Sequence, residues 1–304
     1  MKLFRLLFLF VLAPSFCFSW NDSGHMTAGA VAYYYLKQNN PAVLQKVLVS
    51  LQQHPWYTSK WSDKMAGLTA EQKDVALFML ASTWPDEARK DSLYGGPERA
   101  KWHYINYPVS TGEDNLLIPS VIPTPNAEGK LAELETSLKG QADSKEKAVN
   151  LCWLFHIVED IHQPLHTVAL FDARHPEGDK GGNDTYIVLS DSTKAVRLHG
   201  YWDGLVPGTF SNIPQKAQEL LKDKKYKESK LKEIKAHQKV TDWTKLEGID
   251  LARTTVYNNV SINGTQATPT RVDKDYIAAA KTLGEKRVVI SGIRLAKKLA
   301  GIYS

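Results

Sequence analysis

Residues 151–170 read LCWLFHIVEDIHQPLHTVAL, and this stretch indicates both how the chain folds and where its chemistry lies. Its apolar residues predict a buried helix, which His156, Asp160 and His166 interrupt. In a helix Asp160 lies one turn beyond His156 on the same face, and Pro164 is expected to bend the segment before His166. Burying imidazole and carboxylate groups together is costly unless a partner satisfies them, and a zinc ion is such a partner. The segment therefore predicts a metal site inside the protein.

The first nineteen residues, MKLFRLLFLFVLAPSFCFS, have the form of a secretory signal peptide. A short basic start precedes an apolar run, and small residues stand three and one positions before Trp20. The run is too short for a convincing membrane span, and the residues before Cys17 do not fit a lipoprotein signal. We expect cleavage before Trp20 and a secreted or periplasmic protein without stable membrane association. The alternative is a retained membrane anchor.

Residues 20–304 are expected to form a single, mainly helical domain of the all-α class with one small β-hairpin. The hairpin would join residues 185–189 to residues 194–200, after a glycine-rich loop, and residues 105–126 are expected to be a loop. We expect Pro85 to end the helix that precedes it. Helices are predicted over residues 23–37, 41–53, 70–82, 129–139, 144–163, 213–239, 241–258 and 273–302.

Cysteine content and charge give weaker indications. Once Cys17 leaves with the signal peptide, Cys152 is the one cysteine left, so no intramolecular disulfide can form. On an apolar helix Cys152 is expected to be a packed core thiol rather than a nucleophile. The formal net charge of +5 suits an anionic substrate such as nucleic acid or phospholipid, but many secreted proteins are equally basic.

Four short elements outside the central segment also combine tryptophan with histidine or aspartate. They are Trp20-Asn-Asp-Ser-Gly-His25, Trp84-Pro-Asp-Glu-Ala-Arg89, Trp102-His-Tyr104 and Leu198-His-Gly-Tyr-Trp-Asp203. A single histidine beside tryptophan is more often structural than a ligand. Five such elements in a chain with nine histidines instead indicate a site for several metal ions.

In their order along the chain these elements resemble the S1/P1 nucleases, which are zinc-dependent enzymes of fungi, plants and some bacteria. The motifs are W-x4-H, W-P-D-x-x-R, W-H-Y-I, H-x-x-x-D-I-H-Q-P-L-H, G-G-N-D and H-x-x-W-D, between Trp20 and Asp203. The predicted C-terminal helices are similar to that family's all-α, phospholipase C/nuclease-like fold. The resemblance implies a zinc-dependent endonuclease with 3′-nucleotidase activity.

The resemblance also implies three zinc ions per chain. The first ion would be held by Asp86, His103, His156 and Asp160. The second would be held by His166, His199 and Asp203, and the third by Asp160, His25 and Trp20. Trp20 would bind through its backbone amine and carbonyl, so signal cleavage would be part of the chemistry, because an acylated nitrogen is no free amine. Otherwise Trp20 is only a large residue after a cleavage site.

The implied reaction is in-line hydrolysis of a phosphodiester to a 5′-phosphate. Zinc lowers the pKa of bound water towards ~7 and so supplies hydroxide, here between ions that Asp160 would bridge. Arg89 would neutralise the phosphoryl oxygens, and Asn183 would donate a hydrogen bond to the phosphate. The alternative for Arg89 is an ordinary ion pair at a helix end, and the alternative for Asn183 is a structural role in a turn. Tyr104 would stack on a base, and Asn106 stands where the fungal enzymes have aspartate, which leaves base preference open.

Two other functions use similar residues. A zinc phospholipase C shares this scaffold, but its final ligand is typically glutamate rather than Asp203, and its first histidine lies further from the terminal tryptophan than His25. A non-catalytic zinc-binding protein would need neither Arg89 nor an open coordination position. The sequence favours a monomeric nuclease that acts on single-stranded nucleic acid and 3′-nucleotides, with no protein partner.

Overall fold

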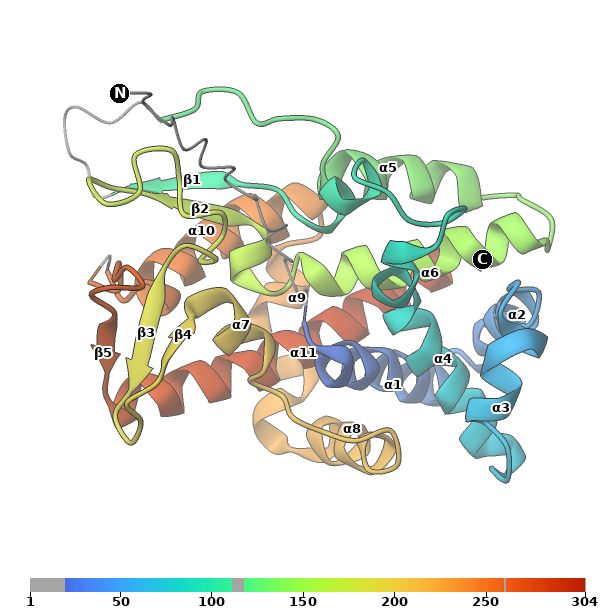
Figure 1. Ribbon diagram of the computed structural model, residues 1–304. Coiled ribbons are helices and arrows are strands. Elements are labelled where there is room, and N and C mark those ends of the chain that lie inside the picture. Colours follow the sequence, from blue (N-terminus) through green and yellow to red (C-terminus); the bar gives the residue numbers. More distant parts are fainter. Residues whose placement is uncertain (1–19, 111–117, 260, 304) are drawn as a thin grey trace, which may run out of the picture.

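The computed structural model describes residues 20–110, 118–259 and 261–303, and this part of the chain is mainly helical (Figure 1). The predicted signal peptide, residues 1–19, lies outside it. None of the helices described is long and apolar enough to cross a membrane. The expected all-α class is confirmed, with short strands at one end of the molecule.

Four helices form the centre of the described structure: α1 (Asp22–Asn39), α4 (Ala70–Glu87), α6 (Lys145–Asp160) and α11 (Lys274–Tyr303). Helix α1 packs against α4 and α11, and α6 packs against the same two helices. Their contact faces are apolar and fully buried, as at Phe78 of α4 and Phe155 of α6, whose rings meet edge to face. Burial of these faces stabilises the helices more than intrinsic propensity does.

The other α-helices of the described residues surround this centre. They are α2 (Pro41–Leu51), α3 (Ser62–Lys64), α5 (Ala127–Leu138), α7 (Leu198–Asp203), α8 (Ile213–Lys222), α9 (Lys232–Ala236) and α10 (Gly248–Leu251). The expected helices at residues 23–37, 41–53, 129–139 and 273–302 are present to within a few residues.

Several helix predictions differ from the structure. Helix α4 continues through Pro85 to Glu87, because Trp84 and Pro85 are buried and packing holds the last turn despite one lost hydrogen bond. The segment 213–239 is broken after α8, where the Asp223 side chain accepts the Lys225 N–H and starts a tight turn instead. The segment 241–258 is helical, but α10 in it is flanked by π-helical turns.

The predicted hairpin is confirmed as β3 (Tyr186–Leu189) and β4 (Ala195–Arg197), with Tyr186 opposite Arg197. Residues 198–200, which were expected in its second strand, instead begin α7. The sheet has a third strand, β5 (Thr270–Val272), which runs parallel to β3. Part of the expected loop at residues 105–126 is also a strand, β1 (Tyr107–Ser110), and it pairs in parallel with β2 (Val168–Phe171). This pairing joins the segments that follow His103 and His166.

A buried charged cluster anchors α11 to the turn that follows α6. Glu247 accepts hydrogen bonds of 2.5 Å from both Arg287 and Arg294. Arg287 donates to the carbonyl of His162, and Arg294 donates to His162 Nε2, each at 2.9 Å. His162 therefore fixes the turn by hydrogen bonding to α11.

We predict that Glu247→Gln lowers the free energy of unfolding by roughly 3–5 kcal/mol, because it leaves two buried guanidinium groups without a counter-charge. Burial alone would raise the pKa of Glu247, but Arg287 and Arg294 hold that pKa well below its usual range. The stabilisation is thus complete above the ordinary glutamate pKa and is lost as the pH falls through the lowered one.

Urea unfolding at about pH 7 and at about pH 3 measures the loss of stability and its pH dependence. The difference in the free energy of unfolding between wild type and variant should narrow in acid. The control is Glu71→Gln, which breaks the exposed Lys37–Glu71 pair and should change stability by less than about 1 kcal/mol. Equal effects of the two substitutions would rule out the role given to this cluster.

Candidate metal centre

Three groups of histidine and aspartate side chains lie at the centre of the described structure. The groups are His25, His156 and Asp160; Asp86, His103 and His156; and His166, His199 and Asp203. In each group, one ligand atom per residue lies within 4.8 Å of the others. The structure thus brings together every side chain that the sequence offered as a metal ligand, from α1, α4, α6, α7 and two 3-10 turns, η3 (Arg99–His103) and η4 (Pro164–His166).

Four atoms form the tightest arrangement: Asp86 Oδ1, His103 Nδ1, His156 Nε2 and Asp160 Oδ2. His156 Nε2 lies 2.9 Å from His103 Nδ1, 3.2 Å from Asp160 Oδ2 and 3.4 Å from Asp86 Oδ1. His103 Nδ1 lies 3.0 Å from Asp160 Oδ2 and 3.7 Å from Asp86 Oδ1. Tetrahedral zinc with bonds of about 2.0–2.1 Å sets its ligand atoms about 3.3–3.4 Å apart. The donor types and spacing of this group fit zinc.

The second group contains buried polar atoms that lack partners. His199 Nε2 lies 3.5 Å from Asp203 Oδ2, and His166 Nε2 lies 3.9 Å from Asp203 Oδ1. Among the described residues, His166 Nε2 and Asp203 Oδ2 have no hydrogen-bond partner. An unsatisfied buried polar atom costs roughly 1–3 kcal/mol, so this group also fits a cation that binds to both.

The third group lies where the described chain begins. His25 Nε2 is 3.4 Å from Asp160 Oδ1, and the His25 ring stacks on His156 with centroids 4.1 Å apart. Trp20 is buried over the first turn of α1, and a Cβ at Gly24 would lie 2.9 Å from its indole ring. Glycine at position 24 therefore allows Trp20 to fold back beside His25.

Asp160 takes part in the first and third of these arrangements and lies near the second. Its Oδ2 atom faces His103 and His156, whereas its Oδ1 atom faces His25 and lies 3.7 Å from His166 Nδ1. Burial alone would raise the pKa of Asp160, but His156 and His166 hold it well below the usual range. The two oxygens of this carboxylate therefore face different sets of histidines.

The orientation of four histidines is fixed by hydrogen bonds from Nδ1. The acceptors are the Glu159 carboxylate for His25 and the backbone carbonyls of Ser82, His103 and Gly181 for His156, His166 and His199. A ring that donates from Nδ1 keeps Nε2 as the lone-pair nitrogen, which is the form that binds metal. Nε2 of each ring accordingly faces its group.

The turn after α6 brings His166 back towards Asp160. The helix ends at Asp160 rather than at residue 163, and Pro164 opens η4, so the bend expected at the proline takes the form of a 3-10 turn. Gln163 stabilises it by accepting from Leu165 N, and its amide donates to Asp203 Oδ1 at 2.9 Å. One glutamine thereby connects the turn to α7.

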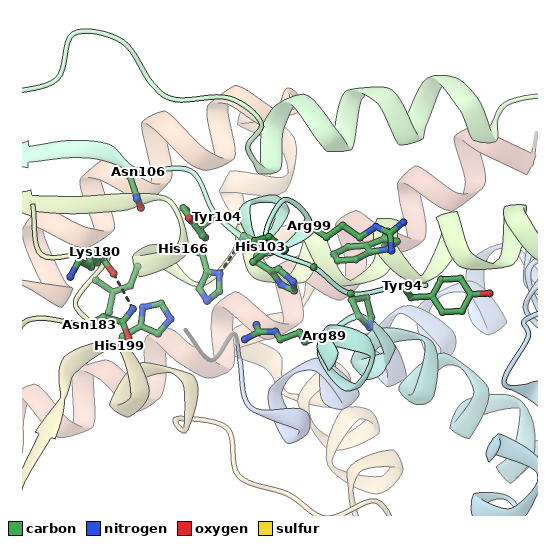
Figure 2. Close-up of a pocket in the computed structure, with 17 residues that line it drawn as sticks. Arg89, Tyr94, Arg99, His103, Tyr104, Asn106, His166, Lys180, Asn183 and His199 are labelled. Carbon is green, nitrogen blue, oxygen red and sulfur yellow. Dashed lines mark hydrogen bonds between the residues drawn. The ribbon is translucent and has the colours of Figure 1, made fainter. Parts of the chain in front are cut away.

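A pocket of about 540 Å³ opens beside the metal-ligand groups. Figure 2 shows Arg89, His103, His166 and His199 around the same space, with Tyr104, Asn106 and Asn183 also on its walls. The residues expected to bind substrate therefore meet in one pocket.

Arg89 and Asn183 also make the structural contacts that were the alternatives to their substrate-binding roles. The Arg89 guanidinium lies 2.7 Å from Asp86 Oδ1, and Asn183 donates to the carbonyl of Lys180 at 2.9 Å. Arg89 is thus paired with a predicted ligand while lining the pocket, and Asn183 closes a turn there.

Sequence reasoning missed several residues of this region. Lys180, Tyr94 and Arg99 line the pocket, and Glu159 is buried between His25 and Ser82. Tyr94 and Arg99 follow no recognisable motif. Glu159 could have been noticed, because it is a second carboxylate beside Asp160 in an otherwise apolar helix.

Comparisons with known proteins show the family to which the chain belongs. The family model described as S1/P1 Nuclease matches residues 20–304. Endonuclease 5 of Arabidopsis thaliana is 26% identical over 307 residues, covering 94% of this chain and 90% of that protein. Endonuclease 4 and Endonuclease 3 of the same plant are each 25% identical, covering 94% of this chain and 89% of theirs. The chain therefore belongs to the S1/P1 nuclease family and is a nuclease, an enzyme that hydrolyses phosphodiester bonds.

Proposed function

We propose that this nuclease is a zinc-dependent endonuclease that hydrolyses single-stranded RNA and DNA to 5′-phosphate products and also acts on 3′-nucleotides. The observation that carries the proposal is the set of three histidine–aspartate groups beside one pocket of about 540 Å³. The names of the Arabidopsis relatives support endonuclease activity.

Zinc is the metal that best suits the donors, because nitrogen and carboxylate ligands at tetrahedral spacing are typical of it. We propose three ions per chain, with Asp160 shared and with Trp20 contributing its backbone amine and carbonyl. When bound, zinc supplies an activated water at neutral pH and neutralises charge on phosphoryl oxygens.

The side chains of the pocket would bind and orient the substrate. Arg89 lines the pocket with its guanidinium 2.7 Å from Asp86 Oδ1, and we assign to it a contact with a phosphoryl oxygen that gains charge in the transition state. We assign to Asn183 a hydrogen bond to the same phosphate. Tyr104 would stack on a base, and Asn106 would contact the base edge as both donor and acceptor.

The protein is proposed to act as a monomer outside the cytoplasm, after removal of residues 1–19. This follows from the form of the signal sequence and from the need for a free amine at Trp20. Stable membrane association and a protein partner are not part of the proposal.

We expect the protein that begins at Trp20 to release 5′-mononucleotides from single-stranded RNA and DNA and to lose this activity with a chelator. Phosphatidylcholine serves as the matched alternative substrate, because zinc phospholipase C uses a similar scaffold. Chromatography of the products identifies the cleaved bond. Lipid hydrolysis without nucleotide release would contradict the substrate class while leaving the metal site intact.

Asp160→Asn should lower kcat/KM on single-stranded DNA by roughly 10³-fold or more, equivalent to about 4 kcal/mol of transition-state stabilisation. An amide lacks the second anionic oxygen that two ions would share. Steady-state kinetics on a fluorogenic oligonucleotide measure the loss. The control Asp275→Asn changes an exposed carboxylate at the start of α11 and should retain wild-type kinetics, whereas wild-type turnover by Asp160→Asn would exclude the bridging role.

A further inference from the structure

Glu159 is a fully buried carboxylate to which the proposed reaction gives no role. Its Oε2 atom accepts a hydrogen bond from His25 Nδ1 at 2.7 Å, and its Oε1 atom accepts one from Ser82 Oγ at 2.8 Å. Its backbone carbonyl accepts from the indole N–H of Trp20 at 3.1 Å. Glu159 therefore contacts two of the three residues proposed to hold the third ion, and it directly precedes the third, Asp160.

The contact with His25 differs from those of the other oriented histidines. His156, His166 and His199 donate Nδ1–H to backbone carbonyls, whereas His25 donates to a carboxylate. A carboxylate behind an imidazole fixes the ring and makes its other nitrogen a stronger metal donor. His25 Nε2, the nitrogen opposite Glu159, is 3.4 Å from Asp160 Oδ1.

The surroundings of Glu159 argue against a role in packing alone. A buried carboxylate is costly, and a leucine would fill an apolar helix position without that cost. Both carboxylate oxygens are instead hydrogen bonded, and Ser82, which holds one of them, also orients His156 through its backbone carbonyl. Helix α4 thus sets the position of Glu159 and of a proposed ligand of the first ion at once.

We propose that Glu159 is a positioning residue for the third metal ion, which holds His25 and Trp20 in place and increases the donor strength of His25. This inference rests on the proposed three-ion site. We expect the effect on the third ion to be the largest, because Glu159 accepts hydrogen bonds from two of the residues proposed to hold that ion, His25 and Trp20.

The test measures zinc affinity rather than activity, using proteins that begin at Trp20. Zinc is titrated in competition with a chromophoric chelator, and elemental analysis gives the stoichiometry. In Glu159→Leu we expect one of three ions to bind roughly 10–100-fold more weakly, with the other two unchanged. Glu159→Gln keeps an acceptor for His25 but loses the charge, so its loss should be smaller.

Two controls separate this role from general damage to the core. Leu154→Ala also truncates a fully buried side chain of α6 but keeps the Glu159–His25 contact. It should leave all three affinities within about 3-fold of wild type, below the 10-fold effect of a lost outer partner. A protein with one extra residue before Trp20 should lose the same ion, and adding Glu159→Leu to it should cause no further loss.

Three unchanged affinities in both Glu159 variants would overturn the proposal, and so would equal weakening of all three ions. If Glu159→Leu does not fold by circular dichroism, Glu159→Gln decides between the same outcomes. A wild-type protein that binds three ions but releases no nucleotides would contradict the proposed substrate and leave this inference standing. Fewer than three ions in the wild type would overturn both.

Discussion

The carboxylate of Asp160 is the constraint on which the rest of the structure depends. It lies fully buried at the end of α6, with one oxygen towards His103 and His156 and the other towards His25. A buried carboxylate is tolerated only when charges and hydrogen bonds satisfy it. Segments far apart in the sequence, α1, η3 and η4, meet at this group, and each places a histidine nitrogen within 3.7 Å of it.

A second layer of hydrogen bonds keeps those donors in place. Backbone carbonyls of Ser82, His103 and Gly181 orient three rings, and Gln163 connects the turn after α6 to Asp203. In addition, the cluster of Glu247, Arg287 and Arg294 holds the carbonyl and ring of His162. The histidine–aspartate groups are thus built on helices and on two short turns that hydrogen bonds hold in place, and precise metal binding requires such support.

Much of this arrangement could be predicted from the sequence, because helices with strong apolar periodicity and ligands in short motifs are local signals. The helix at residues 273–302 and the pairs His156–Asp160 and His199–Asp203 are of this kind. The parallel pairing of β1 with β2 could not be predicted, since it depends on contacts between distant segments. The continuation of α4 through Pro85 depends on the burial of Trp84, and Glu159 belongs to no motif.

The charges around His25 explain why the fold favours a metal ion at this position. Burial alone would lower the pKa of His25, but Asp160 and Glu159 raise it to about 10, so the neighbouring carboxylates favour positive charge at this position. A metal ion would supply that charge while the imidazole stays neutral, as ligation requires. Anomalous diffraction at the zinc edge, on crystals of the protein that begins at Trp20, tests this most directly. The account predicts three zinc peaks with Asp160 bound to two of them, and a peak count below three or an Asp160 bound to a single ion would contradict it.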